Sequence, residues 1–474
     1  MLKLLPFVLL ILLLGGFPVL ANALDQYSVR FDGGLEKVYV QVCFEGSAPK
    51  RIYHSSHAAE FASELKTPTG TFKIQKDADS SRLPRLAPDS CLEWQLDLEK
   101  AAARADFRFA MRVGEDLVTD TDLWFWRGAG DRPARVGVEL PAGINISVPW
   151  KLTDLSGTGL SGERIFFEPA NTPASWASRI AVGRFANQTL KTVNSEIRFA
   201  LLGGLDAPVQ DKLTQWLEQA VMAVAGVYGQ FPQTSPQVLI IPIGARSNPV
   251  PWAHVMRGGG VSAEFFVDQT RPLNELSEDW TACHELSHML LPFISSKDRW
   301  LSEGLASYYQ YILLARTGML TEQQAWQGMF DGLKRGENGT RSGRRASTLA
   351  DATLEGRENT MRIYWSGAAM MLMADTQIRA ASGNLQSLDT ALASLKDCCL
   401  EQGKRWRAGE LFKRLDSLTG KGIFGALYDE YVQSKQFPDL SATWQSLGIE
   451  IRSKRVWLND HHAGSDIRKT IMKN

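Results

Sequence analysis

Four residues in one stretch of the chain have the types and the spacing of a catalytic metal site. The stretch, Asp279 to Tyr311, reads DWTACHELSHMLLPFISSKDRWLSEGLASYYQY. His284 and His288 are four positions apart, so on a helix both imidazoles project from one face and reach the same zinc ion. Glu285 lies beside the first histidine, where its carboxylate can take a proton from an attacking water. Glu303, in the amphipathic run WLSEGLASYY, is the candidate third ligand, which leaves a fourth position open for water as in catalytic zinc sites.

Two other interpretations of these residues exist. HELSH can arise by chance on a helix whose histidines only pack, because motif matches carry a risk of false positives. A closed structural zinc site is the second, but no cysteine pair with finger-like spacing accompanies the histidines. The second run, with Glu303 in W-L-x-E-G, favours a catalytic site. The sequence therefore predicts one Zn²⁺ per chain, bound by His284, His288 and Glu303.

The same residues resemble a known group of enzymes. HELSH followed by WLSEGLASYY is similar to the gluzincin metallopeptidases, in which a glutamate on a following helix completes the zinc site. Within that group the chain resembles the glycyl aminopeptidase family more than the relatives around aminopeptidase N. The supporting segment is IYWSGAAMMLMADTQIRAASGNLQSLDTALASL, from Ile363 to Leu395. The resemblance implies that Tyr364, in Y-x-x-G, donates a hydrogen bond to the tetrahedral oxyanion, whereas core packing is the interpretation without it.

The resemblance also implies a glycine-led edge strand that lines the cleft and pairs with the substrate backbone. In RSNPVPWAHVMRGGGVSAEFFVD, the residues at this place are Gly258, Gly259 and Gly260, which are thus the expected substrate-binding residues. The alternative for these glycines is a tight turn or a bulge.

One departure from the family concerns the substrate's amino group. The family carries a glutamate shortly after the glycine, and that glutamate binds the free amine. Here Val261 and Ser262 occupy the matching positions, and the nearest acid is Glu264. A shift of one residue in a strand points a side chain to the other face. The departure bears on the aminopeptidase assignment more than on the peptidase assignment.

The N-terminus has the pattern of a signal peptide over residues 1–23. Lys3 gives a positive start, Leu4 to Leu14 form a short apolar run, and Ala21-Asn22-Ala23 is a small-residue cleavage site. The run is shorter than the ~20 residues of a spanning helix. We therefore expect an exported protein without a stable membrane anchor, in the periplasm or secreted. An uncleaved anchor is the alternative.

Composition indicates an ordinary globular protein. Lysine plus arginine and aspartate plus glutamate number 52 each, and 44% of residues are hydrophobic. Zero formal net charge argues against a nucleic-acid partner. The chain has five cysteines. Cys43 and Cys91 lie in strand-like sequence and are either a disulfide or two buried thiols, while Cys283 is expected to pack on its helix.

Periodicity predicts an α+β multidomain fold. After the signal peptide, residues 24–175 alternate apolar and polar residues between turn signals, which indicates an antiparallel β-sandwich or saddle. Residues 176–400 combine helical periods with buried strands, and the resemblance implies a thermolysin-like α/β zinc peptidase domain there. Residues 401–474 are expected to form a small helical region with a frayed polar tail.

Three functions remain open from the sequence. The expected substrate is a peptide or protein, and the resemblance favours an aminopeptidase. An endopeptidase is the second candidate, because a cleft without an amine-binding acid lets a longer peptide pass through. The third is a catalytically idle peptide-binding protein, which the intact set of zinc residues and Tyr364 argues against.

Overall fold

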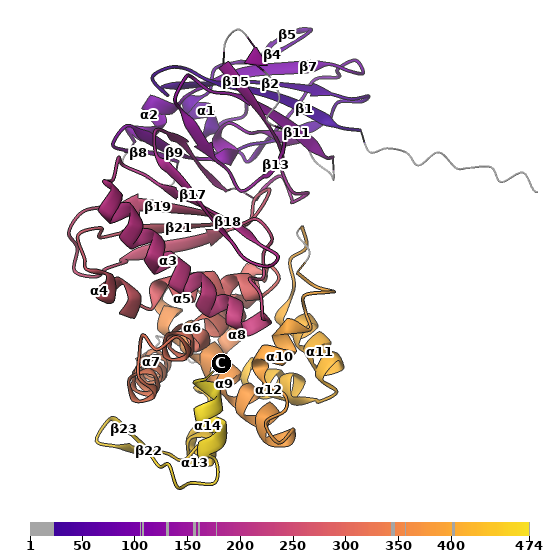
Figure 1. The fold of residues 1–474 in the computed structure, drawn as a ribbon. Helices are drawn as coiled ribbons and strands as arrows, with labels where there is room; N and C mark the ends of the chain where they lie inside the picture. The colour runs from indigo at the N-terminus through magenta and orange to yellow at the C-terminus, as the bar shows by residue number, and fades with distance from the viewer. Residues whose placement is uncertain are drawn as a thin grey trace, which may run out of the picture.

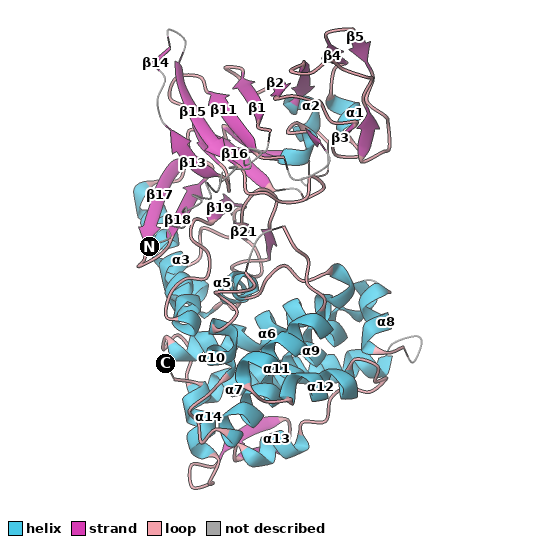
Figure 2. Ribbon diagram, turned by 90° about the vertical axis from the view of Figure 1, so that its right-hand side faces the viewer, coloured by secondary structure: helices cyan, strands magenta, loops and turns pink. Residues whose placement is uncertain are grey.

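The computed structural model describes residues 23–104, 106, 109–128, 132–154, 158–159, 162–176, 178–342, 347–355, 357–400 and 403–473. The expected signal peptide, apart from its last residue, lies outside the described residues. Strands dominate the N-terminal part and helices the C-terminal part, and a mixed sheet lies between them (Figures 1 and 2). The predicted α+β multidomain class is confirmed.

The N-terminal part is built from strands that bury alternate side chains. Strand β2 (Lys37–Phe44), KVYVQVCF, buries every second residue, as a strand packed on one face does. It pairs antiparallel with β1 (Asp25–Phe31) and with β7 (Cys91–Asp97). On its other side β1 pairs in parallel with β11 (Ala134–Glu139). The expected antiparallel sheet thus contains a parallel pair, joined by the long connection that parallel strands require.

The remaining elements of this part complete three sheets. They are β3 (Arg51–Tyr53), α1 (Ala58–Phe61), β4 (Leu65–Thr67), β5 (Gly70–Phe72), β6 (Ser80–Arg82), α2 (Leu98–Ala102), β8 (Ala110–Val113), β9 (Asp116–Asp120), η1 (Thr121–Leu123), β10 (Arg127–Gly128), β12 (Asn145–Ser147), β13 (Lys151–Asp154), β14 (Thr158–Gly159), β15 (Gly162–Glu168) and β16 (Arg179–Gly183). The sheet orders are β13-β15-β11-β1-β2-β7-β4-β5 with β14 on β15, β10-β3-β6, and β12-β16-β9-β8.

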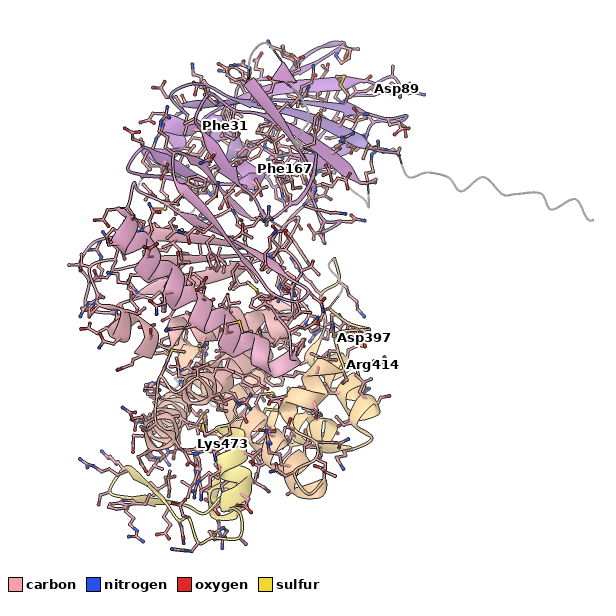
Figure 3. The ribbon with its side chains drawn as sticks, viewed as in Figure 1. Phe31, Asp89, Phe167, Asp397, Arg414 and Lys473 are labelled. Atoms are coloured by element: carbon pink, nitrogen blue, oxygen red, sulfur yellow. A yellow bond between two sulfur atoms is a disulfide. The ribbon has the colours of Figure 1, made fainter. Side chains whose placement is uncertain are left out.

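Aromatic side chains fill the core of the N-terminal part. Trp94 and Trp126 stack with ring centroids 4.7 Å apart. Phe31 and Phe167, both buried, mark this core in Figure 3. A disulfide joins Cys43 on β2 to Cys91 on β7. The sequence left open whether these residues form a disulfide or remain two buried thiols, and the structure has the disulfide.

A five-stranded sheet connects the N-terminal part to the helices. Its strands are β17 (Ala186–Lys191), β18 (Glu196–Leu201), β19 (Gln237–Pro242), β20 (Trp252–Met256) and β21 (Ser262–Val267). Their order is β17-β18-β19-β21-β20; β18, β19 and β21 are parallel, and β17 and β20 are antiparallel edges. Helix α3 (Ala207–Tyr228) runs along this sheet (Figure 1).

Two helices in close contact form the centre of the helical part. They are α6 (Arg299–Arg316) and α9 (Thr360–Ala381). A Cβ on Gly304 of α6 would lie 2.4 Å from Cα of Gly367 on α9, so only glycine allows these backbones to approach so closely. The surrounding elements are α4 (Leu273–Glu278), α5 (Thr281–Ser287), η2 (His288–Leu290), η3 (Ser296–Asp298), α7 (Glu322–Ser342), α8 (Leu349–Leu354) and η4 (Arg357–Asn359).

The C-terminal region packs against these helices. It contains α10 (Leu388–Ala393), α11 (Ala408–Thr419), α12 (Ile423–Tyr431), α13 (Ser441–Ser446), β22 (Ile449–Arg452), β23 (Arg455–Leu458) and α14 (Ser465–Ile471). Trp300 of α6 meets Phe412 of α11 with ring centroids 5.8 Å apart, so one core spans both regions.

The structure differs from the expected C-terminal region in two respects. The β22–β23 hairpin interrupts the helices. The tail is helical rather than frayed, because Ile471 is buried and Arg468 pairs with Glu322 at 2.8 Å. None of the helices described is both long and apolar enough to cross a bilayer.

Candidate active site

The three expected zinc ligands come together from two segments. His284 lies on α5, His288 begins η2, and Glu303 lies on α6. One ligand atom from each lies within 4.8 Å of the other two. Oε2 of Glu303 is 3.5 Å from Nε2 of His284 and 3.6 Å from Nε2 of His288. The fold therefore brings together the three atoms that the sequence predicted for one metal.

The HELSH motif is not one continuous α-helix. Helix α5 ends at Ser287 and continues as the 3₁₀ turn η2. His288 keeps helical angles, with φ −58° and ψ −25°, so its imidazole stays on the side of His284. The spacing argument therefore remains valid across the change of helix type.

A side chain of α6 positions each histidine. Nδ1 of His284 lies 3.0 Å from Oε1 of Gln310, and Nδ1 of His288 lies 2.9 Å from Oγ of Ser302. When Nδ1 carries the proton and donates a hydrogen bond to this partner, Nε2 keeps its lone pair for a metal. Helix α6 thus supplies both a ligand and the two groups that orient the others.

The donor set fits a divalent cation. Burial lowers the pKa of His288 to about 4, which keeps its imidazole neutral. Burial opposes ionisation of Glu303, but contact with His284 and the charges of His288 and His284 hold the pKa of Glu303 at about 2. Oε2 of Glu303 is buried and has no hydrogen-bond partner among the described atoms. An ionised, unpartnered carboxylate oxygen facing two imidazole nitrogens is the donor set of a zinc site.

Arg257 fixes the end of the motif. Its Nη2 donates to the carbonyl oxygens of His288 at 2.7 Å and Leu291 at 3.0 Å. Carbonyls at the end of a helical segment have no partner within the helix. Burial lowers the pKa of Arg257 to about 10, so it is still charged at neutral pH.

Glu285 and Tyr364 line the cleft together with two of the proposed ligands, His288 and Glu303. Burial raises the pKa of Glu285 to about 7. Tyr364 lies on α9, and its ring stacks on His284 with centroids 5.7 Å apart and planes 10° from parallel. Burial and the neighbouring Glu303 carboxylate raise the pKa of Tyr364, so its phenol keeps the proton that it can donate. The expected base and the expected hydrogen-bond donor therefore both face the metal site.

The cleft has a volume of about 470 Å³, within the usual range for small-molecule and short-peptide sites. Strand β20, the segment between η2 and α6, and the facing sides of α6 and α9 form its walls. Its lining residues are Trp252, Ala253, His254, Val255, Arg257, Glu285, His288, Pro292, Phe293, Ile294, Ser296, Arg299, Ser302, Glu303, Tyr364 and Arg405.

The expected substrate-binding glycines, Gly258, Gly259 and Gly260, are not among the residues that line this cleft. The N–H of Gly259 donates to Oγ of Thr172 at 2.8 Å. A Cβ on Gly260 would lie 1.8 Å from the carbonyl oxygen of Pro149. The glycines therefore permit close packing against the N-terminal part, and their expected substrate-binding role stays a prediction.

The edge strand beside the cleft is β20, which precedes the glycines. Among the described strands it pairs only with β21, and four of its five residues line the cleft. The glycines predicted an edge strand that follows them, whereas the edge strand of the sheet, β20, precedes them. His254 of β20 lines the cleft as well.

Glu264 lies on β21, opposite His254 of β20. It is 1% exposed, and Nη1 of Arg179 lies 3.1 Å from its carboxylate. Glu264 is not among the residues that line the cleft, although its side chain lies on the same face of the sheet as that of His254, which is directly opposite it. The described lining residues contain two carboxylates, Glu285 and Glu303.

Sequence reasoning missed several residues of the site. Gln310 follows Glu303 by seven positions, which is two helical turns. Ser302 directly precedes Glu303. The helical period of α6 could have indicated Gln310. Arg299 is one turn before Glu303 on the same helix. Arg405 comes from a loop far away in sequence, and no local pattern indicates it.

Comparisons with known proteins agree with this geometry. The family model of the M61 glycyl aminopeptidases matches residues 294–380, which include Glu303 and Tyr364. No curated protein matches the chain significantly.

Solved structures share the fold at low sequence identity. An aminopeptidase N family protein from Idiomarina loihiensis has a TM-score of 0.69 at 15% identity, covering 90% of this chain and 79% of that one. An M1 zinc metallopeptidase from Deinococcus radiodurans has a TM-score of 0.54 at 15% identity, covering 88% and 94%. A mutant of the latter, solved bound to a Tyr-Ser-Ala substrate, gives the same values. The comparisons agree with the resemblance noted in the sequence: residues 294–380 are similar to the M61 glycyl aminopeptidases, and the fold is similar to that of solved aminopeptidase N family and M1 zinc metallopeptidase proteins.

Proposed function

We propose that the protein hydrolyses peptide bonds with one zinc ion per chain, bound by His284, His288 and Glu303. The observation that carries this proposal is the convergence of two imidazole nitrogens and one carboxylate oxygen within 4.8 Å at the wall of a cleft. When bound there, zinc supplies a Lewis acid that activates water and polarises a carbonyl group.

The residues around the ligands have separate roles in this proposal. Glu285 accepts the proton of the attacking water and returns it to the leaving nitrogen. Tyr364 donates a hydrogen bond to the oxygen that becomes negative in the tetrahedral intermediate. Gln310 and Ser302 hold the two imidazoles in their binding orientation. The free edge of β20 offers backbone groups to an extended peptide.

An aminopeptidase is our first candidate, on the family resemblance. An endopeptidase is the second, and one observation favours it. Glu285 and Glu303 are the carboxylates among the described lining residues, and both have other roles in the mechanism. A substrate amine would therefore need another partner, such as backbone carbonyl groups, whereas an internal peptide bond needs none.

Peptides in matched pairs, with free or acetylated N-termini, test the proposal. Products would be followed by mass spectrometry with and without a zinc chelator. Chelator-sensitive loss of residues from free termini alone identifies an aminopeptidase. Equal internal cleavage of both sets identifies an endopeptidase. Absence of cleavage with zinc bound would contradict the enzymatic proposal and support a peptide-binding protein.

We also propose that the protein is exported to the periplasm or secreted. The N-terminal pattern of residues 1–23 supports this, as does the Cys43–Cys91 pairing, because disulfides persist in oxidising compartments. Cell fractionation and N-terminal sequencing of the full-length protein test it. A mature N-terminus near Leu24 outside the cytoplasm is expected, and an uncleaved cytoplasmic protein would contradict it.

A further inference from the structure

An arginine with two nitrogen atoms that have no hydrogen-bond partner among the described residues lies beside the proposed metal site. Arg299 is the first residue of α6, one helical turn before Glu303, and it lines the cleft. Its Nε and Nη2 are buried, and neither has a hydrogen-bond partner in the described part of the chain. Its charge acts on Tyr364, where it opposes the rise in pKa caused by burial and by Glu303.

Some buried arginines of the protein have carboxylate partners, whereas the buried Arg362 donates to Ser347 and Ser434. Arg379 lies 3.0 Å from Asp375, and Arg468 lies 2.8 Å from Glu322. Arg299 as a whole is half-buried, but guanidinium nitrogens that are buried without a partner are unfavourable and need an explanation. Arg299 does not pair with Glu303, whose carboxylate is turned to the histidines. Its guanidinium is therefore available to an anion that enters the cleft.

A second arginine lies at the same cleft. Arg405 is exposed, and its guanidinium lies over Trp176 and Phe293, 5.0 and 5.4 Å from the ring centroids. The two rings meet edge to face, with centroids 4.4 Å apart. Stacking restrains a guanidinium while its donor edges stay free, which prepares it for a planar anion. Within the described chain, Arg405 has no carboxylate partner.

The lining residues therefore have an excess of unused positive charge. Arg257 donates to backbone carbonyls, and Glu303 faces the proposed metal position. Arg299 and Arg405 are the lining cations without such a use. A guanidinium binds a carboxylate through two parallel hydrogen bonds, and such bonds are stronger than neutral ones.

We propose that the cleft selects peptides that carry a carboxylate close to the scissile bond, with Arg299 binding that carboxylate and Arg405 contacting it at the entrance. The carboxylate belongs to an acidic side chain or to the C-terminus of a short peptide. Because four residues of helix span about 6 Å, an anion on Arg299 lies within one or two peptide residues of the bond at the metal. This inference rests on the peptidase function proposed above.

Matched peptides distinguish the two sources of the carboxylate. One series places Glu or Gln at each position of an otherwise all-alanine peptide with an amidated C-terminus. A second series compares neutral peptides with free and amidated C-termini. A kcat/KM at least about tenfold higher for one carboxylate-bearing peptide than for its neutral partner is expected, since a hydrogen bond to a charged group has this magnitude.

Variants assign the preference to the cleft. Arg299→Gln removes the charge without removing a hydrogen bond of Nε or Nη2 to a described residue, so the variant is expected to fold, and its preference should fall to within about threefold. Arg405→Gln should reduce it in part. Arg414→Gln removes an exposed arginine on α11, labelled in Figure 3, and should keep the full preference. High salt should weaken the preference of the wild type as charges are screened.

The outcomes separate this inference from the proposed function. If the wild type cleaves carboxylate-bearing and neutral peptides equally well, the selection is overturned while the peptidase function stands. If it cleaves none, the peptidase function fails. Calorimetric binding of the Glu and Gln peptides to the Glu285→Gln protein then decides whether the cleft has an anion site. Equal Kd values there overturn the anion site. Tighter binding of the Glu peptide that is lost with Arg299→Gln supports it.

Discussion

Glu285 is adjacent in sequence to one proposed ligand, yet its carboxylate is not among the three ligand atoms that come together. It faces the cleft, where a general base must be. Glu285→Gln should therefore lower kcat by about 10²–10⁴-fold, the usual contribution of general acid–base catalysis. Its zinc content, measured by atomic emission, should equal that of the wild type.

Glu278→Gln is the matched control for this variant. It makes the same change at an exposed position just before the motif and should leave kcat unchanged. Substantial turnover by Glu285→Gln would rule out the proposed role of this residue.

Gln310 shows how a residue outside the ligand set can control metal affinity. Gln310→Ala removes the partner of Nδ1 of His284, so the ring is free to rotate and to change tautomer. Its zinc affinity, measured by competition with a chromogenic chelator, should fall about 10–100-fold. Glu303→Ala removes a proposed ligand, so its zinc affinity should fall further than that of Gln310→Ala. Gln445→Ala, at an exposed position of α13, should bind zinc like the wild type; equal affinity in Gln310→Ala would contradict the orienting role.

At the scale of elements, the contact between α6 and α9 sets the distance from Glu303 to Tyr364. A Cβ on Gly367 would lie 2.1 Å from the carbonyl oxygen of Trp300 and 2.7 Å from Cα of Gly304. Gly367→Ala should separate the helices and lower the free energy of unfolding by about 1–3 kcal/mol, the usual effect of overpacking. Chemical denaturation followed by circular dichroism measures this change.

A glycine in open space provides the control for the helix contact. A Cβ on Gly422 would meet no atom within 4 Å, and its φ is −85°. Gly422→Ala should therefore change stability by no more than about 0.5 kcal/mol. If both substitutions had the same small effect, close packing of α6 and α9 would not be what requires Gly367.

At the scale of the whole molecule, the two disulfides differ in what they constrain. Cys43 and Cys91 are 48 residues apart, and their bond closes a long loop of the unfolded chain. Replacing both by serine should lower the free energy of unfolding by roughly 4 kcal/mol on the chain-entropy model. The calorimetric transition in which the N-terminal part unfolds should move to lower temperature.

Cys398 and Cys399 are neighbours in sequence, and their bond closes no loop of comparable length. Serine at both positions should therefore produce a much smaller shift in the same calorimetric scan. Equal shifts for the two double variants would show that loop closure is not the origin of the stabilisation.

Much of the fold class and of the site could be predicted from local patterns. The alternation in KVYVQVCF predicted a strand, and β2 has the burial that this pattern implies. HELSH and WLSEG identified the residues that the fold brings together, because His284 and His288 share one helical turn and Glu303 lies on the next long helix. The spacing Y-x-x-G marked Tyr364, and Gly367 is the residue that lets α9 approach α6.

Local patterns could not reveal features that depend on distant partners. The glycines after β20 looked like the start of an edge strand, but they serve packing against Pro149, more than a hundred residues earlier. The pairing of Cys43 with Cys91 depends on the register of β2 with β7. The helical tail depends on contacts of Arg468 with residues outside its own segment.

The sequence by itself predicted the candidate metal-ligand set, the resemblance to zinc metallopeptidases and the α+β architecture, because each depends on spacings within a few turns or one strand. The tertiary structure decided which strand borders the cleft and which charges in it are unpaired. Arg299 has the same local sequence whether or not a carboxylate faces it. Only the packing of α6 among its neighbours shows that none of the described carboxylates does.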